Sequence, residues 1–249
     1  MNFYSEAYTP TINALAEAGF RVIAVDRIGY GKSSKPILSY SFNMVAANMK
    51  ALLDELGVEK TAIVGHSMGG MAVSRFAMMY PESTTHVVMV NQIGLTDQRQ
   101  SRPWSDPFVG GGATTYRSIL RGHQRYFPLK WPPAHLEFVR RQYGQTLGGD
   151  WPRLAQVRRL QGQMLYDDPV VYDWQHIATK ALVIGGEEDG LVDDFPTLAR
   201  NVANQLQNSA IILYPNVGHA PQIEIPDLLH QDLIRFLSSD ADEPASNWK

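Results

Sequence analysis

The chain contains no cysteine among its 249 residues. This absence excludes disulfide bonds, cysteine-ligated metal sites and a cysteine nucleophile. No apolar run approaches the roughly 20 residues that a membrane-spanning helix needs, so we expect no membrane span. The net charge of −3 gives no electrostatic support for nucleic-acid binding, and we expect no nucleic-acid partner.

The N-terminus has neither the basic start nor the apolar segment of a secretory signal peptide. We therefore expect a cytoplasmic location by default, with one reservation: if the reading frame is truncated, a signal peptide would be missing with it. We see no internal repeat and no low-complexity tract. The length and the 44% hydrophobic content fit one globular domain with an insertion.

One short stretch carries most of the information: Gly-His-Ser-Met-Gly-Gly at 65–70. It follows an apolar run at 61–64 and opens a helix-like run at 71–80. A strand, then Gly-x-Ser-x-Gly, then a helix predicts a sharp turn that exposes the Ser67 hydroxyl group. The same turn directs the main-chain N–H of Met68 toward whatever the serine attacks, which predicts an oxyanion-hole donor.

The glycines of this stretch have separate predicted roles. Residues packed around such a turn must be small, and we expect both Gly65 and Gly69 to meet this need. Gly70 would let the following helix lie close to the sheet.

A serine nucleophile needs a base to take its proton and an acid to orient that base. The usual chain order after this turn is serine, acid, histidine. An acidic loop follows the strand-like run 181–184, with its carboxylates at Glu187, Glu188, Asp189, Asp193 and Asp194. Of the seven histidines, only His219 lies in a loop that follows a strand and comes after the acid. Both loops are expected at the sheet edge that carries Ser67.

Strand-like and helix-like segments alternate along the chain, which predicts an α/β fold with a mostly parallel sheet flanked by helices. Five strands are expected, at 20–25, 61–64, 87–90, 181–184 and 210–214. Helices between them are expected from Thr9 to a stop at Gly19, at 42–56, at 71–80 and at 195–207.

These motifs resemble the α/β-hydrolase superfamily, in particular its small cap-bearing esterase and lipase-like members. The resemblance extends from about Thr9 to Leu237 and is most specific at the turn and at Gly-His-Ala-Pro-Gln, 218–222. Residues 26–34, Asp-Arg-Ile-Gly-Tyr-Gly-Lys-Ser-Ser, also resemble a loop of that family. The resemblance implies Ser67 as nucleophile, His219 as base and, through Gly-x-x-Asp at 186–189, Asp189 as acid. It implies no metal and no cofactor.

The family's usual N-terminal strands and its His-Gly oxyanion loop have no counterpart here, so the expected fold is N-terminally shortened. The family's third strand would lie between 20–26 and 61–64, and its loss would leave two rows of main-chain groups unpaired. Three outcomes are open: the flanking strands pair directly, another chain lends a strand, or the reading frame is shortened. A homo-oligomer that covers the exposed sheet edge is our hypothesis for partners.

Residues 97–175 interrupt the alternation. They hold four of the five tryptophans and carry 11 lysines and arginines against seven acidic residues. Helices are expected near 113–126, 133–145 and 152–166. We interpret 97–175 as a helical cap, 1–96 and 176–237 as the α/β-hydrolase core, and 238–249 as a flexible tail.

The predicted function is cleavage of small-molecule carboxylic esters, with a short to medium acyl chain, through an acyl-enzyme on Ser67. Serine at the turn argues against the family's dehalogenase and epoxide-hydrolase branches, which need a carboxylate nucleophile. Lactonase, thioesterase, perhydrolase and carbon–carbon bond hydrolase activities use the same three residues and stay open. A catalytically impaired relative that only binds a small ligand is the alternative from a different class.

Overall fold

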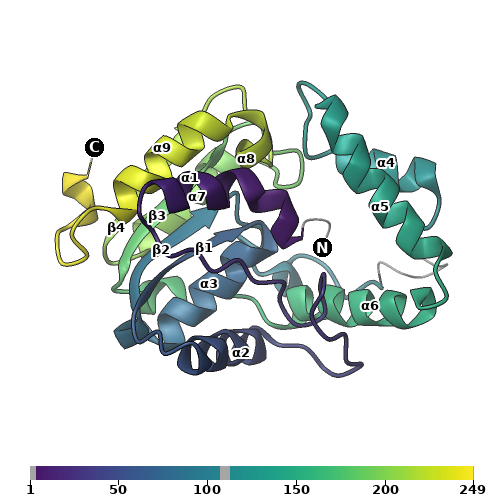
Figure 1. The fold of residues 1–249 in the computed structure, drawn as a ribbon, viewed down its shortest axis with the longest axis horizontal. Coiled ribbons are helices and arrows are strands. Elements are labelled where there is room, and N and C mark those ends of the chain that lie inside the picture. The colour runs from purple at the N-terminus through teal and green to yellow at the C-terminus, as the bar shows by residue number, and fades with distance from the viewer. Residues whose placement is uncertain (1–3, 107–112, 249) are drawn as a thin grey trace.

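A parallel four-stranded sheet forms the centre of the part of the chain that the structure, a computed structural model, describes: residues 4–106 and 113–248. The strands lie in the order β1 (Thr61–His66), β2 (Thr84–Val90), β3 (Lys180–Gly186) and β4 (Ser209–Tyr214), each parallel to its neighbour (Figure 1). The predictions of strands at 61–64, 87–90, 181–184 and 210–214 and of an α/β fold are confirmed.

Helices cover both faces of this sheet. One face packs with α2 (Phe42–Glu55), α3 (Met68–Met79) and α7 (Phe195–Gln205), and the other with α1 (Thr9–Glu17) and α9 (Pro226–Leu237). Side chains alternate along β2: Val87 and Met89 belong to the first core, and Val88 and Val90 to the second. Figure 1 shows α1 and α9 above the sheet and α2 and α3 below it.

The other described elements are short: α8 (Pro221–Glu224) and 3₁₀ helices at Ser5–Tyr8, Pro81–Ser83, Gln98–Gln100, Pro133–His135, Trp174–His176 and Ala245–Asn247. The last of these lies against the core, because the Ala245 N–H donates to Asn208 Oδ1 at 2.6 Å and the Trp248 ring meets Phe236 at 5.3 Å. The flexibility of 238–249 remains a prediction.

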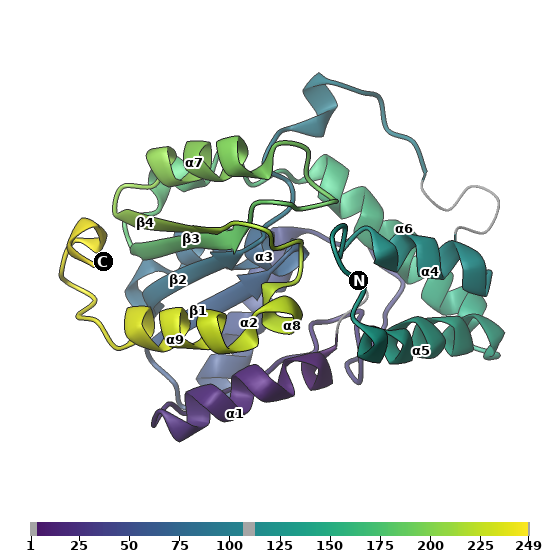
Figure 2. The same ribbon diagram turned by 90° about the horizontal axis from the view of Figure 1, so that it is seen from above.

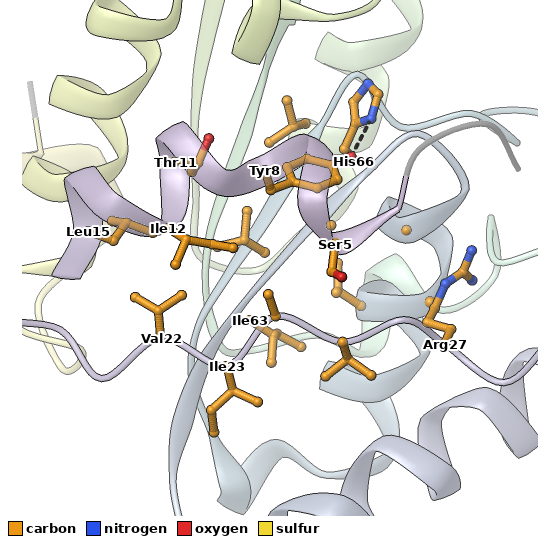
Figure 3. Close-up of a pocket in the computed structure, with 18 of the residues that line it drawn as sticks. Ser5, Tyr8, Thr11, Ile12, Leu15, Val22, Ile23, Arg27, Ile63 and His66 are labelled. Atoms are coloured by element: carbon orange, nitrogen blue, oxygen red, sulfur yellow. Dashed lines mark hydrogen bonds between the residues drawn. The ribbon is translucent and has the colours of Figure 1, made fainter. Parts of the chain in front are cut away.

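The prediction of a strand at 20–25 is wrong. Residues 20–27 belong to no strand, and within the described residues no hydrogen bond reaches the main chain of 21–25. A cavity of about 470 Å³ lies between this segment, α1 and β1 (Figure 3). The run Phe20–Val25 has the apolar pattern of a strand, but a strand also requires a partner within hydrogen-bonding distance.

Direct pairing of the flanking segments, the first of the three outcomes, is therefore also wrong. In the described chain β1 pairs with β2 on one side, and its other side faces the cavity, where Val64 is 42% exposed. An oligomer that covers this edge remains a prediction.

Three helices lie beside the sheet: α4 (Tyr116–Gln124), α5 (Leu136–Leu147) and α6 (Trp151–Asp167). They agree with the helices predicted in 97–175, of which residues 107–112 lie outside the described part. Figure 2 shows the strand arrows pointing toward this group. The boundaries that separate a core, a cap and a tail remain predictions.

Among residues 4–106 and 113–248, no helix combines the length and the hydrophobicity that crossing a bilayer requires.

Candidate active site

Ser67 occupies a strained turn between β1 and α3. Its φ of 58° and ψ of −123° are unusual for a residue with a side chain and cost on the order of 1–3 kcal/mol. Two main-chain hydrogen bonds hold this conformation: Ser67 N–H to Val90 O at 2.9 Å, and Gly70 N–H to Ser67 O at 2.9 Å. The sharp turn predicted at Ser67 is present in the structure.

Only part of the glycine prediction holds. A Cβ on Gly65 would lie 2.2 Å from the carbonyl oxygen of Gly69, and one on Gly70 would lie 2.6 Å from the Cβ of Gln92. Gly65 and Gly70 are therefore required by close packing. The expectation for Gly69 is wrong, because a Cβ there would meet no described atom within 4 Å apart from its chain neighbours and the main chain of its own helix.

Met68 begins α3. The first N–H groups of a helix have no acceptor inside the helix, and the helix dipole places partial positive charge there. The Met68 N–H is thus suited to stabilise an oxyanion beside Ser67. Its side chain is buried, with Sδ 3.7 Å from the hydroxyl of Tyr30.

Asp189 and His219 come together at the carboxyl edge of the sheet, after β3 and β4. The Nδ1 atom of His219 lies 2.7 Å from Oδ2 of Asp189, and both side chains are fully buried. Because an ionised carboxylate oxygen can only accept, Nδ1 donates to Oδ2, which leaves Nε2 as the ring nitrogen that can act as the base. This is the tautomer that a base next to a serine needs.

The carboxylate of Asp189 is stabilised in its charged form. Burial by itself raises the pKa of Asp189, but the hydrogen bonds from His219, from the Leu191 N–H at 2.8 Å and from Asn91 Nδ2 at 2.9 Å outweigh it and lower the pKa. Of the acidic residues in this loop, Asp189 is the one that contacts His219.

His219 is fully buried and held on several sides. Its main-chain N–H donates to Tyr126 O at 2.9 Å, and its ring stacks on the Tyr126 ring with 5.4 Å between centroids. Its Nε2 is buried and has no hydrogen-bond partner in the described chain, so the Ser67 hydroxyl does not bond to it here. In this structure Asp189 and His219 are hydrogen-bonded to each other, and the hydrogen bond between His219 and Ser67 is not formed.

His66, next to Ser67, links the N-terminal segment to the loop of His219. Its Nε2 donates to the carbonyl oxygen of His219 at 2.7 Å, and its Nδ1 accepts from the Tyr8 hydroxyl at 2.9 Å. Burial and the neighbouring His219 lower the pKa of His66 to about 3, so this ring is neutral at physiological pH.

Sequence reasoning missed two residues that position the pair. Asn91, at a positive φ of 38° after β2, donates to Asp189 and accepts from the Gly186 N–H at 3.0 Å. Glu224 accepts from the N–H groups of Gly218 and Ala220 on either side of His219. For Asn91 the sequence offered one signal, a polar residue directly after a buried strand. For Glu224 the sequence offered no signal.

These observations define a class: an open α/β sheet with a strained serine turn and a buried acid–histidine pair at its carboxyl edge. A family model described as the alpha/beta hydrolase fold matches residues 2–226. The chain therefore belongs to the alpha/beta hydrolase family.

Three similar proteins illustrate the relationship. The structure of a probable hydrolytic enzyme from Pseudomonas aeruginosa PAO1 is 34% identical, with a TM-score of 0.91, and the match covers 96% of this chain and 83% of that one. The putative carbamate hydrolase RutD of Stutzerimonas stutzeri is 23% identical over 96% of this chain and 89% of its own length. The bifunctional epoxide hydrolase 2 of Sus scrofa is 25% identical over 96% of this chain, which spans half the length of that relative.

Proposed function

We propose that the protein is a serine hydrolase that cleaves carboxylic esters of small molecules through an acyl-enzyme on Ser67. The observation that carries the proposal is the buried Asp189–His219 hydrogen bond at the sheet edge that also bears the strained Ser67 turn. Strain of this kind is retained where the surrounding structure over-determines it, which is common at reactive residues.

In the proposed reaction, the Ser67 Oγ attacks the ester carbonyl carbon while Nε2 of His219 takes the hydroxyl proton. The Met68 N–H stabilises the negative oxygen of the tetrahedral intermediate. Collapse of the intermediate breaks the bond to the alcohol, which leaves with the proton from His219. Water then attacks the acyl-enzyme by the same steps and releases the acid.

Asp189 keeps the His219 ring in its reactive tautomer and stabilises the imidazolium that forms in each step. The base–serine hydrogen bond would form in the substrate complex, since such contacts are often long in free enzymes. The α4–α6 helices would act as a cap over this edge, because Tyr126, which follows α4, already stacks on His219.

The relatives support hydrolysis and leave the substrate open. A carbamate, as in the name of one relative, presents the same kind of carbonyl carbon as an ester. Epoxide hydrolysis, as in the name of another, is disfavoured because this chain has serine rather than a carboxylate at the turn. Lactones and thioesters fit the same mechanism, and a ligand-binding protein without turnover is the alternative outside the enzymes.

The test compares the wild type with Ser67→Ala on p-nitrophenyl acetate and butyrate. We expect kcat/KM to fall by at least about 10³-fold, because the nucleophile is lost. Ser101→Ala, at an exposed serine, is the matched control and should be unchanged. Labelling of the wild type, but not of Ser67→Ala, by a fluorophosphonate is the second readout. Absence of both turnover and labelling would favour the binding protein.

A further inference from the structure

The loop that carries His219 is fixed by hydrogen bonds at three consecutive main-chain N–H groups. The carboxylate of Glu224 accepts from Gly218 at 3.0 Å and from Ala220 at 3.2 Å. The carbonyl oxygen of Tyr126 accepts from His219 at 2.9 Å. Glu224 belongs to α8, which follows this loop directly, whereas Tyr126 lies between α4 and α5. The α4–α6 region therefore supplies part of the support for the proposed base.

The chain at 125–128 runs directly against the loops of the proposed acid and base. A Cβ on Gly190, the residue after the acid, would lie 2.2 Å from the carbonyl oxygen of Arg125. A Cβ on Gly218 would lie 2.6 Å from the carbonyl oxygen of Tyr126. A residue with a side chain at either position would push the chain at 125–128 away, so glycine at both positions permits this close approach.

Contacts inside the α4–α6 region hold Tyr126 in place. The Tyr126 N–H donates to His123 O at 3.0 Å, and the Phe127 N–H donates to Gln124 O at 3.1 Å. The Phe127 side chain is 4% exposed, and its ring centroid lies 4.6 Å from that of His135. The position of Tyr126 is therefore set by its own surroundings before any substrate binds.

Two rings contact the imidazole of His219. Tyr126 stacks on it, with 5.4 Å between centroids and 29° between planes, and His66 is tilted by 49° at 4.9 Å. The χ2 torsion of a histidine is broadly distributed, so the single hydrogen bond to Asp189 leaves the ring plane loosely defined. The stacked Tyr126 ring restricts that plane, and with it the direction in which Nε2 points.

The stacked ring also favours the charged form of the base. In the proposed reaction His219 takes the Ser67 proton and becomes an imidazolium, which would lie against the face of the Tyr126 ring. A cation within about 6 Å of an aromatic ring face is attracted to it, more strongly in a buried site. The His219 side chain is fully buried. His66 adds no opposing charge, because burial and the neighbouring His219 lower its pKa to about 3.

We propose that Tyr126 is a positioning residue for the base: its ring holds the plane of His219 and stabilises the imidazolium, so that the α4–α6 region contributes to the chemical steps. This inference rests on the proposed function for its reaction and on the ring contacts for its residue. Loss of the ring should slow the chemical steps without weakening substrate binding. A tyrosine that only contacted the substrate would act on KM instead.

The kinetic test compares Tyr126→Leu and Tyr126→Phe with the wild type on p-nitrophenyl butyrate. Both variants keep the main-chain hydrogen bond to His219, and only Tyr126→Leu lacks the ring. We expect Tyr126→Leu to lower kcat about 10- to 30-fold with KM within about twofold, and Tyr126→Phe to keep kcat within about threefold. Tyr116→Leu removes a tyrosine of α4 that contacts Tyr143 edge-on at 5.7 Å, and this control should keep kcat within about twofold.

A second measurement follows His219 without turnover. The proton between its Nδ1 atom and Asp189 is expected to give a low-field proton NMR signal, which is assigned by its absence in His219→Gln. The wild type and Tyr126→Phe should show this signal alike. Tyr126→Leu should broaden or lose it, because a ring that moves exposes the proton to exchange with water. Thermal unfolding shows whether Tyr126→Leu is folded, and Tyr126→Met repeats both measurements if it is not.

The two proposals fail in different ways. Turnover that requires Ser67 but is the same in Tyr126→Leu as in the wild type, with an unchanged His219 signal, would overturn the role of Tyr126 and leave the hydrolase intact. A His219 signal that depends on the Tyr126 ring, with no turnover of any ester, would overturn the hydrolase and leave the positioning of His219 by Tyr126 intact.

Two further outcomes would overturn the role of Tyr126 alone. A rise in KM with kcat unchanged in Tyr126→Leu would place Tyr126 against the substrate rather than behind the base. An equal fall in kcat in Tyr126→Phe and Tyr126→Leu would assign the effect to the hydroxyl group rather than to the stacked ring.

Discussion

The two glycines around Ser67 have different surroundings, and this difference can be measured. A methyl group on Gly65 would collide with the main chain of Gly69 at 2.2 Å, and a main-chain atom cannot move aside as a side chain can. Gly69 is the second residue of α3, and a methyl group there would meet no described atom within 4 Å apart from its chain neighbours and the main chain of its own helix.

We expect Gly65→Ala to lower the free energy of unfolding by about 1–3 kcal/mol and, if the proposed function holds, to reduce turnover of p-nitrophenyl butyrate at least tenfold, because the turn must shift. Gly69→Ala should leave activity within about twofold and raise stability by up to about 1 kcal/mol, since alanine is the better helix former. Urea denaturation and turnover of p-nitrophenyl butyrate measure both effects. Equal effects of the two substitutions would contradict the packing described for this turn.

At the residue scale, a feature formed by neighbouring residues in the chain could be predicted from the sequence, and a contact between residues far apart in the chain could not. The Ser67 turn follows from six consecutive residues, so its sequence alone predicts it. Asn91 acts on Asp189, which is 98 positions away in the chain, and no spacing rule connects the two. The misjudged Gly69 shows that a motif identifies the turn without revealing which of its glycines is crowded.

At the scale of elements, one buried arginine joins the serine-bearing helix to the chain that follows α6. Arg75 of α3 donates through Nε to Asp173 at 2.6 Å and through Nη1 to Asp168 at 3.0 Å. Asp168 also accepts from the N–H of Phe42 at the start of α2, at 2.6 Å. These contacts tie α2, α3 and the return from the α4–α6 segment together.

We expect Arg75→Met to lower the free energy of unfolding by about 3–5 kcal/mol, because it leaves the buried Asp173 carboxylate without its cation. Arg159→Met breaks the pair with Asp106, in which the arginine is 51% exposed, and should cost less than about 1 kcal/mol. Chemical denaturation followed by circular dichroism compares the two. A cost for Arg75→Met as small as that for Arg159→Met would show that the network adds little.

The 20–25 segment shows what an element needs beyond its own pattern. Its apolar residues favour an extended chain, and the chain is indeed without helix there. Strand formation depends in addition on a neighbour that offers main-chain partners, and in the described residues β1 does not come close enough. The four strands that were predicted correctly all have such neighbours.

For the molecule as a whole, alternation of strands and helices was enough to predict the layers, because each helix that follows a parallel strand must return across a face of the sheet. The position of α4–α6 beside the carboxyl edge could not be predicted in this way. It depends on contacts such as that between the His219 N–H and the carbonyl oxygen of Tyr126, which join loops remote in the chain.

Stability of the whole molecule should depend on acidity through its buried histidines. His123 and His135 lie in the α4–α5 region, each 1% exposed, with His123 Nδ1 2.8 Å from His135 Nε2. Burial, and then the neighbouring His123, lower the pKa of His135 to about 3, and burial lowers the pKa of His123 as well.

A histidine whose pKa is lowered by folding binds its proton more readily in the unfolded chain. Its effect on stability is therefore absent above the unfolded value of about 6.5 and grows as the pH falls toward the folded value. Between pH 7.5 and 5.5 we expect His135, with its folded pKa of about 3, to lower the free energy of unfolding by about 1.4 kcal/mol. Urea denaturation at the two pH values measures the difference.

His135→Phe should reduce that difference in the free energy of unfolding by about 1.4 kcal/mol. His176→Phe, at an exposed site, is the control variant and should leave the difference unchanged. A pH dependence that is the same in the wild type and in His135→Phe would mean that His135 does not remain neutral in the folded protein.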